Sequence, residues 1–250
     1  EYTRWNRIAI ILNAGKGGRL GMLTDERPKC LVELGGRPIL DFQLDALRLG
    51  GVRNLVMVVG YRDEMIRAYL QRYPEFSVTY IENKDFSETN TAYSLWLARH
   101  EMTEDFLYLN GDVLFHQELI RRLIAAPARN PLAIERKCSG EEEVKVLLKG
   151  VEITAIGKEI IPAQAYGEFI GVAKFSREIG ELFGTTLDQV VVQDRLLKNY
   201  FETAVSRMLG QAFFTALDIS DLPCIEIDFP EDLERAAKVI LPRIAGGCTE

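Results

Sequence analysis

Short continuous runs of apolar residues recur along the first half of the chain, and stretches with apolar positions at helical spacing lie between them. The runs have the length of a strand and the apolar character of strands that are buried on both faces. The predicted strands cover residues 7–13, 54–59, 78–82 and 106–110. The predicted helices cover residues 39–49, 62–73, 91–99 and 117–125.

This alternation of strands and helices predicts an α/β fold with a Rossmann-like, mostly parallel sheet and helices on both faces. In such sheets, ligands bind beyond the carboxyl ends of the strands. The loops that follow Asn13 and Asn110 are therefore the first places to look for a site.

The pattern changes after residue 130. Shorter strand-like segments at 144–148, 153–157 and 169–175 predict a small mixed β extension that covers a substrate. A helical stretch at 188–209, a strand at 224–227 and a helix at 230–240 complete the predicted elements. We expect one domain over residues 1–250, with a core of residues 1–130, an extension of residues 131–220, and a returning strand and helix in residues 221–250.

Composition and charge exclude several classes of protein. The 250-residue chain has a formal net charge of -7 and no basic stripe, so it lacks the cations that an extended nucleic-acid surface needs. Its longest apolar runs fall far below the roughly 20 residues that cross a bilayer, so no membrane insertion is expected. Cys30, Cys138, Cys224 and Cys248 show neither close pairing nor zinc spacing, which favours reduced thiols in a cytoplasmic protein.

The most informative segment is the glycine-rich loop after the first predicted strand. Glycines let backbone N–H groups approach an anion closely, and Lys16, Arg19 and Lys29 add positive charge in an acidic chain. The loop predicts a triphosphate site, although a glycine-rich turn with solvated basic residues is the alternative. It is neither a Walker loop nor a dinucleotide fingerprint. The residues expected to touch the nucleotide here are Leu12, Asn13, Ala14, Gly15, Lys16, Gly17 and Gly18.

The whole string LNAGKGGRLGMLTDERPKCLVEL resembles the signature of the sugar-phosphate nucleotidyltransferase family, in which G-x-G-x-R-L is followed by a Thr and by P-K-x-L. Asn13 stands where many members carry Ala. The residues in register are Gly15, Gly17, Arg19, Leu20, Thr24, Pro28, Lys29 and Leu31. The resemblance implies a Mg²⁺-dependent enzyme that transfers a nucleoside monophosphate, with Arg19 and Lys29 as catalytic residues.

Two acidic segments complete this resemblance. Asp112 follows Gly111, a glycine that lets the nucleotide approach, at the end of a predicted strand. A carboxylate there suits Mg²⁺, although a turn or a helix cap would use the same residue. Glu226 and Asp228 alternate along a strand and so share a face, which a solvent-facing pair before a helix would also do. Together they resemble the family's two separated metal-binding acids. We expect Asp112 and Asp228 to be the ligands, with Glu226 as a weaker candidate.

Residues 82–95 resemble the phosphocholine and inositol-phosphate cytidylyltransferase branch. The resemblance implies that Asn90 and Ser94 contact the base or ribose and that Tyr93 faces the acceptor. A helix N-cap and a buried Tyr are the alternative. Further segments that resemble this branch, 144–146, 157–158, 166–169 and 199–202, contain the other expected acceptor residues, Lys145, Tyr166, Glu168 and Glu202.

The implied reaction is attack of an acceptor phosphate oxygen on the α-phosphorus of CTP, with release of pyrophosphate. Arg19 and the loop amides would hold the pyrophosphate, and Lys29 would balance charge at the α-phosphate. Two alternatives are a hexose-1-phosphate uridylyl- or thymidylyltransferase and a non-catalytic nucleotide-binding regulator. Assembly as a homodimer is left open.

The acceptor half is rich in rings and acids. Tyr93, Tyr166, Phe169 and Tyr200, together with Glu168 and Glu202, could form a cation cage if they converge, although a plain core would use the same rings. This supply favours phosphocholine or a related aminoalkyl phosphate or phosphonate as the acceptor, with inositol phosphate next.

Overall fold

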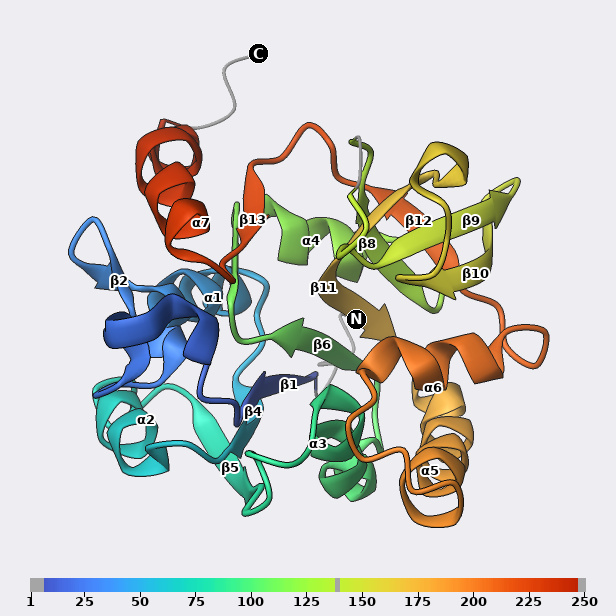
Figure 1. Ribbon diagram of the computed structural model, residues 1–250, viewed down its shortest axis with the longest axis horizontal. Helices are drawn as coiled ribbons and strands as arrows, with labels where there is room; N and C mark the ends of the chain where they lie inside the picture. The colour runs from blue at the N-terminus through green and yellow to red at the C-terminus, as the bar shows by residue number, and fades with distance from the viewer. Residues whose placement is uncertain (1–6, 138–139, 247–250) are drawn as a thin grey trace, which may run out of the picture.

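The parallel part of the sheet is built around β1 (Ile8–Asn13), the first apolar run of the chain (Figure 1). It pairs in parallel with β4 (Asn54–Val59) on one side and with β6 (Phe106–Asn110) on the other. β5 (Ser77–Glu82) lies parallel to β4 at the edge of the sheet. The carboxyl ends of these strands therefore point to the same edge, where the loops after Asn13 and Asn110 meet.

Helices cover both faces of these strands because successive strand residues point to opposite sides. Ala9 and Ile11 pack into a core with residues of α1, α2 and α4, whereas Ile10 and Leu12 pack into a core with residues of α3, α5 and α6. The helices are α1 (Ile39–Leu49), α2 (Asp63–Leu70), α3 (Thr91–Leu97), α4 (Glu118–Ala125), α5 (Gly180–Asp188) and α6 (Phe201–Met208). The predicted α/β fold is confirmed.

The strands of the second half extend the same sheet. Its order is β5-β4-β1-β6-β11-β8-β12-β10-β9, and β11 runs antiparallel to β6. The added strands are β8 (Pro131–Glu135), β9 (Lys145–Lys149), β10 (Glu152–Gly157), β11 (Gly167–Phe175) and β12 (Thr215–Asp218). The apolar pattern does not predict β8 and β12, which are short and pair with each other across a long sequence separation.

β11 bends so that one strand reaches two parts of the sheet. Gly171 has a φ of 77°, and the register with β8 shifts between Phe169 and Ala173. Beyond the bend, Gly167 and Glu168 also pair with β9. Because a positive φ strains residues that have a Cβ, glycine suits this bend.

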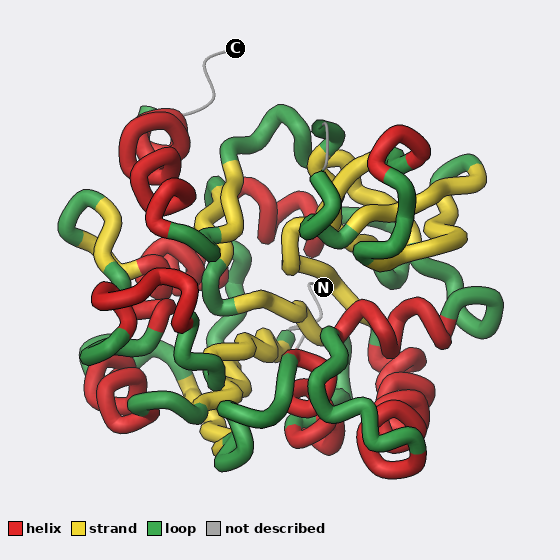
Figure 2. The backbone as a smooth tube through the Cα atoms, in the orientation of Figure 1, coloured by secondary structure: helices red, strands yellow, loops and turns green. Residues whose placement is uncertain are grey.

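The predicted helix at 188–209 is wrong as a continuous helix. α5 begins at Gly180, a π-helical turn covers Gln189–Gln193, and α6 starts only at Phe201. Figure 2 shows a loop between the π-helical turn and α6. Arg195 has a φ of 55° there, and the loop carbonyls of Leu197 and Asn199 accept hydrogen bonds from the backbone at the start of α3. Tertiary hydrogen bonds thus replace the helical ones that local spacing predicts.

The end of the chain returns to the glycine-rich loop. β13 (Cys224–Glu226) pairs antiparallel with β7 (Val113–Phe115), which places Glu226 opposite Val113. α7 (Pro230–Arg235), a π-helical turn and α8 (Leu241–Ala245) follow. Their apolar residues share a core with the 3-10 helix Gly18–Thr24 and with the short hairpin of β2 (Glu33–Leu34) and β3 (Arg37–Pro38).

The structure is a computed structural model that describes residues 7–137 and 140–246. Within these ranges, no helix combines the length and the apolar character needed to span a bilayer. Cys30 and Cys224 are buried free thiols, and burial raises the pKa of Cys30 to about 12. Cys138 and Cys248 lie outside the described residues.

Candidate active site

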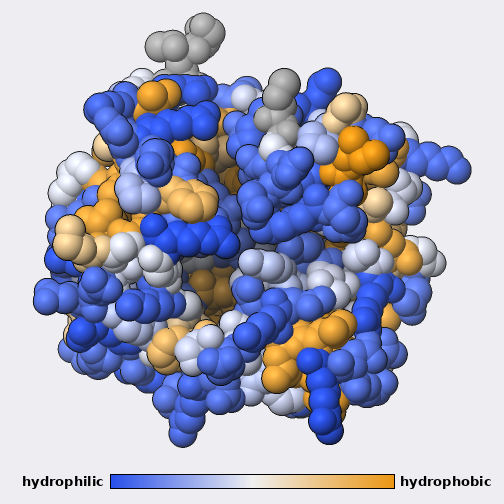
Figure 3. Space-filling view, in the orientation of Figure 1, coloured by the Kyte–Doolittle hydropathy of each residue, from blue (hydrophilic) through white to orange (hydrophobic). Residues whose placement is uncertain are grey.

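A cleft of about 350 Å³ opens at the carboxyl ends of β1 and β6. The face shown in Figure 3 is hollowed near its middle, between the part that carries α7 and the part that carries α6 (Figure 1). The glycine-rich loop lines the cleft, and so do residues from the first turn of α6 and from the loop after β10. The location agrees with the prediction from the strand pattern.

The glycine-rich loop presents most of its expected nucleotide residues to the cleft. Gly17 has a φ of 67°, and its carbonyl accepts hydrogen bonds from Leu20 N and from Thr24 Oγ1, each at 3.0 Å. This turn holds the loop in shape. The cleft is lined here by Leu12, Asn13, Ala14, Gly15, Gly17, Gly18, Arg19 and Lys29. Lys16 is not among the lining residues, because its ammonium turns outward to Asp25 at 3.2 Å.

Lys29 and Arg19 meet the predicted acids. Lys29 Nζ donates to Asp112 Oδ2 at 2.7 Å and to Asp228 Oδ1 at 2.6 Å, and Arg19 donates to Asp228 Oδ2 at 3.0 Å. Burial alone would lower the pKa of Lys29, but Asp112 and Asp228 raise it above its ordinary value. Burial likewise acts to raise the pKa of Asp228, and Lys29 and Arg19 bring it below its ordinary value. These four residues form one charged cluster.

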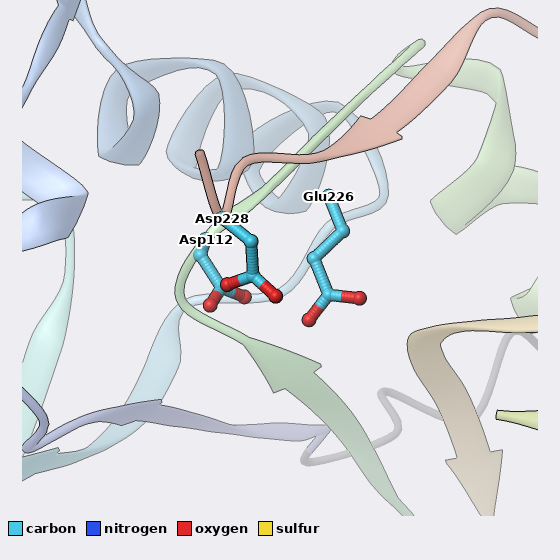
Figure 4. Close-up of side chains that lie close together, drawn as sticks. All are labelled: Asp112, Glu226 and Asp228. Carbon is cyan, nitrogen blue, oxygen red and sulfur yellow. The ribbon is translucent and has the colours of Figure 1, made fainter. Parts of the chain in front are cut away.

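Glu226 joins Asp112 and Asp228 on the other side of this cluster. One carboxylate oxygen from each lies within 4.8 Å of the others, and Figure 4 shows the three side chains around a common space. Burial, together with the negative charges of Asp112 and Asp228, raises the pKa of Glu226 to about 8. Asp112 Oδ1 is buried and has no hydrogen-bond partner among the described residues.

These observations fit a divalent cation. Mg²⁺ prefers oxygen ligands and is commonly bound by one or two carboxylates together with phosphate groups. An orphaned buried carboxylate oxygen is costly unless a cation or a donor reaches it. Asp112, Glu226 and Asp228 therefore provide the oxygen ligands and the negative charge that such an ion would bind.

Asn90 and Ser94 lie on the side of the cleft next to α3. Asn90 caps this helix, with its Oδ1 accepting from Thr91 N at 2.8 Å. Asn83 Nδ2 donates to Ser94 Oγ at 3.1 Å and to Thr89 Oγ1 at 3.0 Å. All of these residues line the cleft, so the cap of α3 is compatible with a place for Asn90 in the cleft lining.

Gly111 lines the cleft between β1 and the acidic cluster. Its N–H donates to Leu12 O at 3.1 Å. A Cβ at this position would overlap Oδ1 of Asn13, so only glycine lets the two loops meet.

The part of the cleft next to α6 contains Glu202, Tyr200 and Lys158. Burial raises the pKa of Glu202 to about 6. Lys158 Nζ lies 4.7 Å from the centroid of the Tyr200 ring and 3.7 Å from Glu142, which is an exposed acid. This part of the cleft thus carries charges of both signs.

Two of the expected acceptor residues have partners elsewhere and are not among the lining residues. Tyr93 donates its hydroxyl hydrogen to Asp85 at 3.0 Å and packs on Trp96. Lys145 is fully buried, and its ammonium donates to three backbone carbonyls of residues 140–143. Lys145 thus orders the loop that carries Glu142, because a buried ammonium needs acceptors.

Tyr166 and Glu168 also lie outside the cleft lining. The guanidinium of Arg136 covers the Tyr166 ring at 5.2 Å. Glu168 is 5% exposed and pairs with Lys137 at 2.8 Å. The predicted convergence of rings and acids is therefore limited to Phe169, Tyr200 and Glu202.

The sequence interpretation misses Lys158, Asn83 and Phe229 as cleft residues. Lys158 belongs to a segment that resembles the cytidylyltransferase branch, so a signal for it exists in the sequence. Asn83 likewise lies in the segment 82–95 that resembles this branch. Phe229 carries no such signal, because it lies before a predicted helix, where local pattern does not separate cleft from surface.

Comparison with known proteins identifies the family. The model of the MobA-like NTP transferase domain matches residues 9–157, and the chain belongs to this family. The CMP-5'-(3-aminopropyl)phosphonate synthase of Streptomyces rubellomurinus is 35% identical over 243 residues, which are 91% of this chain and 38% of that protein. The CTP:phosphoglutamine cytidylyltransferase of Campylobacter jejuni is 28% identical over 251 residues, which cover 90% of this chain and 97% of that protein.

The fold has a solved counterpart in the CTP:phosphocholine cytidylyltransferase of Streptococcus pneumoniae. The two structures agree with a TM-score of 0.79 at 21% identity, over 94% of this chain and 99% of the other. The family resemblance read from the sequence is confirmed.

Proposed function

We propose that this chain is a Mg²⁺-dependent cytidylyltransferase that transfers CMP from CTP to a small phosphorylated or phosphonylated acceptor and releases pyrophosphate. The observation that carries the proposal is the cluster of Lys29, Arg19, Asp112 and Asp228 at the mouth of the glycine-rich loop. It places cations and metal-binding acids where a loop of backbone N–H groups can hold phosphates. The named activities of the relatives agree with this class of reaction.

The nucleotide half of the cleft has two cationic groups with different surroundings. The side chain of Arg19 is 47% exposed, so it can follow a leaving pyrophosphate, together with the amides of Gly15, Gly17 and Gly18. Lys29 is 12% exposed and fixed by two carboxylates, so it suits charge balance at the α-phosphate. Positioning and charge neutralisation are the main demands of phosphoryl chemistry.

Asp112, Asp228 and Glu226 would hold the magnesium ion. Asp112 uses Oδ2 for Lys29, and its Oδ1 has no protein partner among the described residues, so it can serve both cations. When bound, Mg²⁺ polarises phosphate oxygens and offsets the negative charge that the two reactants bring together. Glu226 accepts a proton readily in the unliganded protein, because burial and its two neighbours raise its pKa.

Lys158 is the cation of the acceptor half. Because the acceptor phosphate is anionic at neutral pH, it needs a counter-charge and no base to become a nucleophile. Lys158 lines the cleft away from the glycine-rich loop and can hold this phosphate for attack on the α-phosphorus. Its present neighbours, Glu142 and the Tyr200 ring, lie at the edge of the same space.

Pyrophosphate release is the test of the proposed function. The protein is supplied with Mg²⁺ and with CTP, UTP, dTTP, ATP or GTP, each over a panel of small alkyl phosphates, phosphonates, inositol-1-phosphate and glucose-1-phosphate. We expect turnover with CTP and a small acceptor. Preference for UTP or dTTP with glucose-1-phosphate would instead support a hexose-1-phosphate nucleotidyltransferase. Tight nucleotide binding without turnover would support a regulator.

A further inference from the structure

Glu202 is a largely desolvated carboxylate in the part of the cleft next to α6. It lies in the first turn of α6 and lines the cleft. Within residues 7–137 and 140–246, no Lys, Arg or His nitrogen approaches it to 4.0 Å, although Lys158 acts on it at longer range. Burial raises its pKa to about 6, so it is charged at neutral pH at a cost in free energy. A ligand cation at this position would remove that cost.

A carboxylate in the first turn of a helix is also favoured by the helix dipole. For Glu202, burial outweighs any such effect, because its pKa is raised. Glu181 provides the contrast, since it occupies the first turn of α5 and is exposed to solvent. The position in the helix is the same, and only Glu202 faces a cleft.

The rings of the cleft do not form an open cage for a quaternary ammonium. The Lys158 ammonium lies over the Tyr200 ring at 4.7 Å, and the Arg19 guanidinium lies over the Phe229 ring at 5.5 Å. Phe201 is stacked on Tyr108 at 4.0 Å and is 1% exposed. Recognition of choline-like cations relies on several converging open ring faces.

The remaining two rings are also engaged. Phe169 is 4% exposed and packs against Phe201 at 5.7 Å, and Phe86 makes an edge contact with Tyr61 at 6.0 Å. What the acceptor half offers a cation is therefore a carboxylate, which is satisfied best by N–H donors.

We propose that the acceptor is a short alkyl phosphate or phosphonate that carries a primary ammonium, with its phosphorus group held by Lys158 and its ammonium bound by Glu202. The inference rests on the proposed function and specifies its acceptor. Lys158 and Glu202 line the same part of the cleft with opposite charges, as the two ends of such a molecule require. A quaternary ammonium has no N–H to donate and would leave the buried carboxylate oxygens without hydrogen bonds.

An N-methylation series tests the proposal on the unmodified protein. Phosphoethanolamine, its N-methyl and N,N-dimethyl derivatives and phosphocholine are compared in CMP transfer from CTP, and 2-aminoethylphosphonate tests the phosphonate arm. We expect kcat/KM to fall along the series, by about tenfold or more from the first member to the last, because a charge-assisted hydrogen bond is lost. Equal or higher kcat/KM for phosphocholine would overturn the inference and leave the proposed function intact. If no acceptor in this series or in the wider panel is converted, both are wrong.

Glu202→Gln keeps the shape and removes the charge. We expect it to lower kcat/KM for phosphoethanolamine by about tenfold or more, and not to lower that for propyl phosphate, the isostere in which a methyl group replaces the ammonium. Glu181→Gln is the matched control and should change neither value. Thermal unfolding and CTP affinity establish that Glu202→Gln is folded. Equal losses for both acceptors in a folded variant would show that Glu202 has only a structural role and would overturn the inference.

Discussion

The ammonium of Lys29 lies 2.6 Å from Oδ1 of Asp228, although 199 positions separate the two residues in the sequence. The contact joins the segment after the glycine-rich loop to the segment after β13, and Asp112 at the end of β6 closes the cluster at 2.7 Å. Charged side chains from three segments that are distant in sequence therefore interact with one another. Removal of any member changes the electrostatic free energy of the others, and the following predictions use this coupling.

Replacement of Asp112 or Asp228 by Asn should remove most Mg²⁺-dependent turnover and leave the fold in place. The amide keeps the shape of the side chain but supplies no negative charge to a metal ion. Pyrophosphate release and circular dichroism measure the two effects. Asp63→Asn, which alters an ion pair with Arg67 on α2, is the control for a generic loss of an acid. Near-normal activity in both site variants would contradict the metal assignment.

Lys29→Ala should lower turnover more than it weakens CTP binding, because the positive charge matters most when negative charge builds up around the α-phosphorus. Single-turnover rates at saturating CTP and calorimetric titration separate the two quantities. Lost affinity with preserved single-turnover rate would make Lys29 a binding residue only.

The same substitution should destabilise the unliganded protein, because Asp112, Asp228 and Glu226 would lose the cation that separates their charges. Breaking such a buried pair costs about 3 kcal/mol, and we expect added Mg²⁺ to restore part of it. Urea unfolding with and without Mg²⁺ provides the measurement. Lys16→Ala, which removes an exposed pair with Asp25, should change the unfolding free energy by less than about 1 kcal/mol.

A further prediction concerns the space around Gly111. Gly111→Ala places a Cβ on Oδ1 of Asn13, so we expect a loss of about 1–3 kcal/mol in unfolding free energy together with weaker CTP binding. Gly184→Ala in α5 has free space around its Cβ and a helical setting, and it should stabilise the protein by about 0.5–1 kcal/mol. Opposite signs for the two variants in chemical unfolding would support the argument, and equal signs would contradict it.

The sequence predicts those elements whose causes are local. β1, α1 and β4 follow from apolar spacing and from the glycines that end α1, and the predicted and observed bounds differ little. The stretch at 188–209 has similar spacing, but its middle residues hydrogen-bond to α3 and form a loop. Local spacing contains no information about those partners, so this prediction fails.

The residues of the candidate site also fall into those that a local motif identifies and those whose role depends on partners distant in the sequence. Arg19, Lys29 and Gly111 belong to short motifs whose residue types already suit a phosphate or a metal, and the structure places them in the cleft. Lys145 and Glu168 are of suitable types too, yet backbone carbonyls and Lys137 take up their charges. A charged residue in the acceptor half can serve a ligand only where the fold places it in the cleft, as it does Lys158 and Glu202, and that depends on pairing across the sheet.

Glu202 should make the stability of the protein depend on pH. Its pKa in the folded protein, about 6, lies above its ordinary value of 4.5 because burial disfavours the charged form. The folded protein therefore tolerates the protonated side chain better than the charged one. The contribution of protonated Glu202 to the free energy of unfolding is fully present below pH 4.5 and is lost as the pH rises through 6. The loss relative to an uncharged side chain should reach about 2 kcal/mol above pH 7.

Urea unfolding of the wild type and of Glu202→Gln at pH 4.5 and pH 7.5 measures this loss directly. We expect the advantage of Glu202→Gln over the wild type to be larger at pH 7.5, whereas the exposed Glu181→Gln should show no such dependence. Saturating phosphoethanolamine should reduce the difference at pH 7.5, because the bound ammonium would stabilise the carboxylate in place of water. A difference between the two proteins that is the same at both pH values would mean that Glu202 is already well solvated. Its charged form would then carry no desolvation cost that a bound acceptor could offset.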